Sequence, residues 1–199
     1  MSRLIKSSRK IIPIIIAVIF LFPIGAFAST TEEINTKPFA LTIENYNERL
    51  QRKLSKYEIT ETDKKIDEPY IHNTANDIIF GYTDYVNHKV VIYNTGKGIK
   101  DNHTMDHEAG HVFDTWDNEN WSNSKEEVPF LYSHSDEFES IFEKERHSID
   151  SYSLEKYSNT NIEEYFAETF AWYLEKPKQL KKSSPLTYAF MDKVYNWKN

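Results

Sequence analysis

The chain of 199 residues contains no cysteine. This absence excludes disulfide bonds, a cysteine nucleophile, a thiolate metal site and a lipid anchor attached to cysteine. Glycine is scarce as well, with five residues, and neither a phosphate-binding P-loop nor a GxSxG nucleophile elbow is present. The sequence therefore points away from nucleotide hydrolysis and from cysteine-based or serine-based acyl transfer.

Basic residues are too few to balance the acidic ones. The chain has 24 Lys and Arg against 31 Asp and Glu, which gives a formal net charge of −7. A chain this acidic has no electrostatic footprint for nucleic acid or for an anionic membrane surface. We expect peptides or proteins as partners and no nucleic acid.

The one long apolar run lies near the N-terminus, at residues 11–24. Four basic residues precede it, and the small-residue pattern Ala26-Phe27-Ala28 follows. These features predict a signal peptide over residues 1–28. The run is short for a membrane span and is interrupted by proline, although an uncleaved anchor is the alternative. We expect a secreted, extracellular protein with no stable membrane association after cleavage.

The rest of the chain is predicted to form one domain of the α+β class. Residues 29–40 are polar and read as a flexible leader, and residues 41–199 are long enough for a single core,. Apolar periodicity predicts a mostly helical domain with a small sheet. Helices are expected over residues 42–57, 136–147, 161–175 and 185–197, and a hairpin of strands within residues 78–94.

The most informative motif is HExxH, at residues 107–111. Residues four apart lie on one helix face, so His107 and His111 can reach one tetrahedral metal while Glu108 holds an attacking water. The motif predicts zinc-dependent peptide hydrolysis, and two chance histidines on an amphipathic helix are the alternative. A strand directly before such a helix is the order expected of zincins, where a sheet edge pairs with an extended substrate.

A catalytic zinc site needs a third protein ligand. Glu164 is the favoured candidate because it shares a helix face with Glu168 and with two alanines, which let that helix approach another backbone closely,. Asp117 is a minor candidate, since the metzincin spacing that would use it requires glycine where this chain has Asp114. An ordinary helix start, capped by Thr160 or Asn161, is the alternative explanation for the glutamates.

Three segments together resemble a known family. HEAGHVFD at residues 107–114, Tyr157, and EYFAETFAWYL at residues 164–174 are similar to the anthrax-lethal-factor-type metallopeptidase domain, which includes the secreted bacterial Pro-Pro endopeptidases. The pattern of that family is HExGHxxD, a tyrosine, and a helix of the form E-[FY]-F-A-E. The resemblance covers roughly residues 75–197.

The resemblance implies a zincin-like fold and one zinc ion per chain. It implies that zinc is bound by His107, His111 and Glu164, that Glu108 is the general base, and that Tyr157 steadies the oxyanion. A surface or core tyrosine is the alternative for Tyr157, because a tyrosine carries no spacing signal of its own. The resemblance also gives Glu168 a supporting role beside the zinc ligands.

Zinc-bound histidines usually donate their other ring proton to a carboxylate or carbonyl. Glu168 and Asp114 are placed for that role, and a solvated helix charge is the alternative for either. The other histidines lack partners at ligand spacing and are interpreted as structural or surface residues: His72, His88, His103, His134 and His147.

Substrate preference is left open by the sequence. The family's substrate cleft includes a tryptophan before the HExxH helix, whereas the first tryptophan here is Trp116. Tyr82, Tyr85 and Tyr93 are the candidates to line the cleft instead. A zincin-like binding module without catalysis is the alternative function, but such a protein is expected to lack the base or a ligand.

Overall fold

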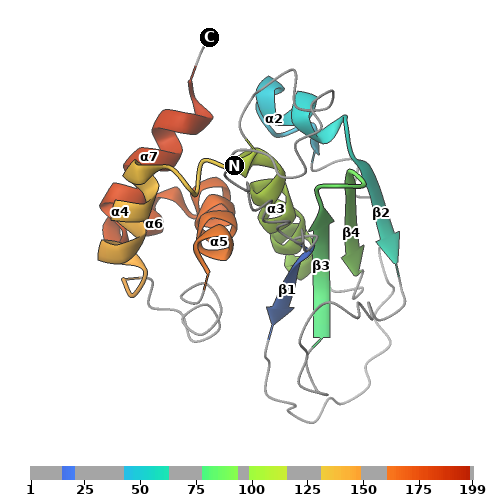
Figure 1. Ribbon diagram of the computed structural model, residues 1–199, viewed down its shortest axis with the longest axis horizontal. Helices are drawn as coiled ribbons and strands as arrows, with labels where there is room; N and C mark the ends of the chain where they lie inside the picture. Colours follow the sequence, from blue (N-terminus) through green and yellow to red (C-terminus); the bar gives the residue numbers. More distant parts are fainter. Residues whose placement is uncertain are drawn as a thin grey trace, which may run out of the picture.

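A computed structural model describes residues 15–20, 43–62, 78–93, 99–115, 131–148 and 161–197 (Figure 1). Within these ranges a small sheet lies on one side of helix α3 (Ile99–Asp114) and a group of helices on the other. This arrangement is the mostly helical α+β fold expected from the sequence. No helix in the described ranges is long and apolar enough to cross a membrane.

The sheet has the strand order β1-β3-β4-β2. Its centre is the predicted hairpin, in which β3 (Ile78–Asp84) pairs antiparallel with β4 (Lys89–Tyr93). The connecting turn places His88 at a φ of 50°, a conformation that few residues other than glycine adopt. The hairpin prediction is therefore confirmed, with the break at the polar residues between the two strands.

Two further strands complete the sheet, and the sequence analysis predicts neither. Strand β2 (Glu58–Thr62) pairs parallel with β4, and β1 (Ile15–Phe20) pairs antiparallel with β3. Strand β1 falls within the predicted signal peptide, and its loss would leave β3 at the sheet edge. The boundaries of the signal peptide, leader and domain stay predictions.

Helix α3 is packed between the sheet and helix α5 (Ile162–Glu175), as Figure 1 shows. Its apolar residues face both neighbours, and Met105, Ala109 and Phe113 are fully buried. Aromatic rings from α5 and from helix α4 (Asp136–Glu145) continue the core. Phe113 stacks on Phe170 with ring centroids 4.9 Å apart. The core thus fixes α3 and α5 against each other.

The remaining helices show where local patterns mislead. Helix α2 (Glu48–Leu54) is shorter than predicted, because the chain turns at residues 55–57 into β2. Helix α6 (Pro177–Ser183) begins where the sequence pattern predicts only the end of the preceding helix, at Lys176-Pro177. Proline is equally suited to the first turn of a new helix. The buried side chain of Leu180 packs that helix against the core. Helix α7 (Pro185–Tyr195) starts at its proline as expected.

Candidate metal centre

The two histidines of the HExxH motif point toward each other from one face of α3. The Nε2 atoms of His107 and His111 are 3.1 Å apart, and both side chains are almost completely buried. One helical turn separates them, so the helix itself sets this spacing. The geometry confirms that the motif is helical and that its imidazoles converge.

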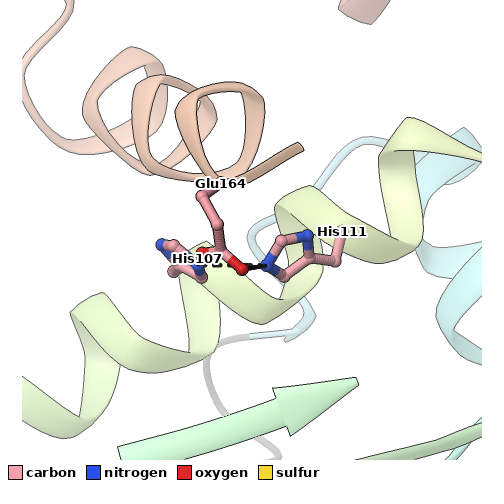
Figure 2. Close-up of side chains that lie close together, drawn as sticks. All are labelled: His107, His111 and Glu164. Atoms are coloured by element: carbon pink, nitrogen blue, oxygen red, sulfur yellow. Dashed lines mark hydrogen bonds and ion pairs between the residues drawn. The ribbon is translucent and has the colours of Figure 1, made fainter. Parts of the chain in front are cut away.

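Glu164 reaches the same point from α5, as Figure 2 shows. One of its carboxylate oxygens lies 3.2 Å from His107 Nε2, and the other lies 3.7 Å from His111 Nε2. Helix α5 begins directly before it, where the Asn161 side chain accepts hydrogen bonds from the backbone N–H groups of Glu163 and Glu164. The cap fixes where the helix starts, and the Glu164 side chain remains available to the histidines.

Small residues allow the two helices to come this close. A Cβ atom on Gly110 would lie 2.8 Å from the Ala167 Cα and 2.9 Å from its carbonyl oxygen. Backbone atoms at such distances leave no room for a side chain, so glycine is required at the crossing. The glycine inside the HExxH motif therefore sets the approach of the third residue, Glu164.

The donor set fits a divalent metal such as zinc. The ligand atoms of His107, His111 and Glu164 all lie within 4.8 Å of one another. His107 Nδ1 is 3.0 Å from Glu168, so a proton on Nδ1 leaves the Nε2 lone pair facing His111 and Glu164. Lone pairs that converge in a buried place repel one another unless a cation lies between them. Two imidazoles and one carboxylate are the protein ligands of many catalytic zinc sites.

The pKa values of the site residues also indicate that positive charge is stabilised at this place. Burial by itself lowers the pKa of His107, but the carboxylates of Glu164 and Glu168 outweigh burial and raise the pKa to about 10. Burial likewise raises the pKa of Glu164, and the two histidines lower it further than burial raises it. A cation, whether a proton or a metal, is stabilised where these side chains meet.

Glu108 lies beside the cluster and faces the sheet. The Thr83 hydroxyl, on β3, donates a hydrogen bond to Glu108 Oε2 at 2.7 Å. The other oxygen, Oε1, is buried and has no hydrogen-bond partner in the part of the chain that the structure describes. Burial raises the pKa of Glu108 to about 8, while His107 and Thr83 oppose the rise. A buried carboxylate of this kind can accept a proton near neutral pH.

Glu168 contacts His107 from the next turn of α5. Its Oε2 accepts from His107 Nδ1 at 3.0 Å, and its Oε1 lies 3.1 Å from both His103 Nε2 and Trp172 Nε1. Burial raises the pKa of Glu168, but His103 and His107 outweigh burial and lower the pKa to about 2. The contact expected between Glu168 and a ligand histidine is present.

Asp114 has a different set of partners from the one expected. Its two oxygens accept hydrogen bonds from the Ser133 N–H at 2.7 Å and from the Ser133 hydroxyl at 2.6 Å. Asp114 therefore contacts neither of the histidines that it was expected to support, and His111 Nδ1 is buried without a hydrogen-bond partner within the described ranges. Because Asp114 is the last residue of α3, its side chain reaches the turn before α4 and anchors that turn.

Three candidates for the site or its helix cap lie outside the described residues, as do His72 and Trp116. They are Tyr157, the expected oxyanion group; Asp117, the minor ligand candidate; and Thr160, the alternative helix cap. Among the cleft candidates, Tyr85 is buried and its hydroxyl donates to the His111 carbonyl at 3.3 Å, whereas Tyr82 and Tyr93 are partly exposed. Tyr85 thus packs against α3 from the turn that follows strand β3. Because it is buried, it is no longer a candidate to line the cleft.

Sequence reasoning missed three residues of the site. Thr83 is brought to Glu108 by packing, and no local signal marks it. His103 and Trp172 do carry a signal in the sequence, because each lies one helical turn from a site residue, His107 and Glu168 respectively,. The sequence pattern predicts a structural or surface histidine at position 103, yet the His103 side chain is 19 % exposed and contacts two carboxylates.

The fold and the convergent histidines and glutamate define the class of zincin-like metallopeptidases. The family described as anthrax toxin lethal factor, N- and C-terminal domain, matches residues 38–194. The chain belongs to this family.

Among solved structures, the chain is similar to the Pro-Pro endopeptidase PPEP-2 from Paenibacillus alvei. The two share 25 % sequence identity with a TM-score of 0.54, over 78 % of this chain and 90 % of the other. No curated protein gives a significant match.

Proposed function

We propose that the protein is a secreted zinc-dependent endopeptidase that hydrolyses peptide bonds of extracellular proteins. The observation that carries this proposal is the meeting of His107, His111 and Glu164 beside a buried Glu108 whose Oε1 has no partner in the described ranges. A binding module that had lost catalysis would be free to lose the base or a ligand. This chain keeps all four residues, which supports an enzyme.

The chemistry divides between the metal and Glu108. Zinc, when bound, supplies Lewis-acid chemistry that lowers the pKa of a water and polarises the scissile carbonyl. Glu108 accepts a proton from the attacking water and later gives it to the leaving amine. Thr83 fixes Oε2 of Glu108, and Oε1, which has no hydrogen bond within the described ranges, is the oxygen left to take the proton.

Charge that develops on the carbonyl oxygen needs a hydrogen-bond donor besides the metal. The family resemblance assigns this role to Tyr157, and a phenolic hydroxyl helps most when it binds the transition state more strongly than the substrate. We include Tyr157 in the catalytic set on that ground.

The substrate proposed is a peptide segment that contains proline. Support comes from the neighbour PPEP-2, whose printed description is a Pro-Pro endopeptidase. The acidic charge of the chain favours peptides that are neutral or basic around the cleavage site,. A library with paired prolines at varied positions tests this preference directly.

The zinc content of the purified protein is the first experiment. We expect about one zinc per chain after dialysis, and a clear loss in Glu164→Ala, because two histidines without the carboxylate bind the metal weakly. Zinc retained equally by both proteins would remove Glu164 from the site and turn attention to Asp117. No zinc in either would favour the binding-module alternative.

Activity is then measured on proline-containing peptides with wild type beside Glu108→Gln. The variant keeps the shape of the side chain but removes the base, so zinc is expected to stay bound while the turnover falls by about 10²- to 10⁴-fold. Equal turnover in both proteins would exclude Glu108 as the base. Amino-terminal sequencing of protein from the culture medium tests export and the expected cleavage after Ala28.

A further inference from the structure

Four side chains form a ladder between the two helices of the metal centre. His103 and His107 are one turn apart on α3, and Glu168 and Trp172 are one turn apart on α5. Glu168 occupies the centre of this ladder and has three nitrogen atoms within 3.1 Å of its oxygens. A buried carboxylate with this many partners has one orientation available to it.

Both ring nitrogens of His103 contact carboxylates of α5. Its Nε2 lies 3.1 Å from Glu168 Oε1, and its Nδ1 lies 2.9 Å from Glu175 Oε1. Since both neighbours are acceptors, both nitrogens carry protons and the ring is an imidazolium. Burial lowers the pKa of His103, but Glu168 and Glu175 outweigh burial and raise the pKa to about 9.

The His103 imidazolium determines which oxygen of Glu168 faces His107. With Oε1 held by His103 and Trp172, Oε2 is directed at His107 Nδ1. That acceptor holds a proton on His107 Nδ1, so Nε2, which faces Glu164 and His111, is the atom that would bind a metal,. Within the described ranges the Nδ1 of His111 has no such partner, so His107 is the ligand whose orientation this network holds.

We propose that His103 is a positioning residue for the zinc ligand His107, acting by bridging Glu168 and Glu175 so that Glu168 is fixed against His107 Nδ1. The inference rests on the proposed function, since it assigns His107 to a zinc ion. It extends the metal centre one turn beyond the HExxH motif, to a motif of the form HxxxHExxH.

The test compares His103→Gln with His134→Gln in the purified full chain. His134 is a matched control, because it pairs with Glu163 of the same helix at 2.6 Å and Glu163 is not among the partners of His107. Zinc affinity is measured by competition with a chelating dye, and the cobalt-substituted proteins are compared by absorption spectroscopy. Thermal unfolding of the metal-free proteins is recorded beside them.

We expect His103→Gln to weaken zinc binding by about 10- to 100-fold, as loss of support for a ligand histidine does elsewhere. We expect a shifted cobalt spectrum in His103→Gln, and no change in affinity or spectrum in His134→Gln. Zinc affinity within about twofold of wild type in His103→Gln would overturn the proposal. Equal losses of affinity in both variants would overturn it too, because loss of any histidine–glutamate pair on α5 would then suffice.

A second measurement needs no variant and covers the case in which His103→Gln does not fold. Nitrogen-15 correlation spectra of the wild-type imidazoles at neutral pH report which ring nitrogens carry protons. Protons on both nitrogens of His103 and on Nδ1 of His107 are expected, and a singly protonated His103 ring would overturn the proposal. If the wild type binds no zinc, the proposed function fails, while these spectra still decide the His103 contact.

Discussion

At the scale of single residues, the chemistry of the site depends on how burial and hydrogen bonds act on Glu108. Burial favours the neutral acid, and the Thr83 hydroxyl favours the charged form, which is the form of the proposed base,. One hydroxyl from a distant strand thus influences the pH range in which the base is ionised.

Thr83→Val removes that hydroxyl while keeping the shape of the side chain. The pKa of Glu108, about 8 in the metal-free site, is expected to rise in the variant. The acidic limb of kcat/KM should therefore move to higher pH by about one unit, with activity restored under alkaline conditions. The pH profile of peptide hydrolysis checks this.

Thr169→Val is the control for that experiment. Thr169 is also buried, and its hydroxyl donates to carbonyls within its own helix. Its profile is expected to follow that of the wild type. A Thr83→Val profile that coincides with wild type would show that the hydrogen bond does not control the ionisation of Glu108.

At the scale of elements, the crossing of α3 and α5 builds the candidate metal centre. Gly110→Ala places a Cβ against the backbone of Ala167, and such overpacking costs about 1–3 kcal/mol. The higher helix propensity of alanine offsets about 1 kcal/mol of this cost. A net loss of stability is expected, together with weaker zinc binding as Glu164 moves from the histidines. Denaturant unfolding and zinc titration measure the two effects.

Asn102→Ala is the matched control on the same helix, because Asn102 is exposed. Its unfolding free energy should stay within about 0.5 kcal/mol of the wild type. If Gly110→Ala were as stable as wild type and bound zinc equally well, the close crossing would not be required for the site.

A second contact between elements uses a buried carboxylate. Glu145 of α4 accepts hydrogen bonds from the N–H groups of Leu186 and Thr187 and from the Thr187 hydroxyl, at 2.8 to 3.0 Å. These N–H groups lie in the first turn of α7, where backbone donors have no acceptor inside the same helix. Glu145 thereby joins two helices that lie far apart in the sequence.

Glu145→Ala leaves those donors without a partner. The free energy of unfolding should fall by about 1–3 kcal/mol, while the zinc content of the folded protein should not change, because α7 contributes no ligand. Glu143→Ala is the control, since Glu143 is exposed and its pair with Arg146 is 3.8 Å long. Equal stability of the two variants would show that the hydrogen bonds to α7 contribute little.

At the scale of the whole molecule, a chain without cysteine is stabilised by its core and, in the proposed function, by a bound metal. The ligands come from α3 and α5, which also carry much of the core. Zinc that binds the folded protein alone therefore stabilises the entire domain by mass action.

Chelation of zinc should lower the melting temperature, and added zinc should restore it. Zinc at a thousand times its Kd would contribute about 4 kcal/mol to the folded state. Differential scanning calorimetry checks this, and Glu164→Ala is expected to respond weakly to chelator or zinc. A melting temperature independent of zinc in the wild type would separate metal binding from folding.

The sequence by itself determined the features that depend on local periodicity. The spacing of His107 and His111 places both on one helix face with Glu108 beside them, and Glu164 is favoured because it shares a face with Glu168 and small residues,. The hairpin and the starts of α4, α5 and α7 followed from apolar alternation and from caps, which act over a few residues. The family resemblance rested on these same segments.

Only the tertiary structure decided the contacts between segments far apart in the chain. It pairs β2 in parallel with β4 and brings Thr83 to Glu108. It also places Asp114 against Ser133 instead of a zinc-binding histidine, and His103 against Glu168 and Glu175. Hydrogen bonds of this kind leave no periodic trace in a sequence, because the packing of whole helices and strands sets which side chains meet.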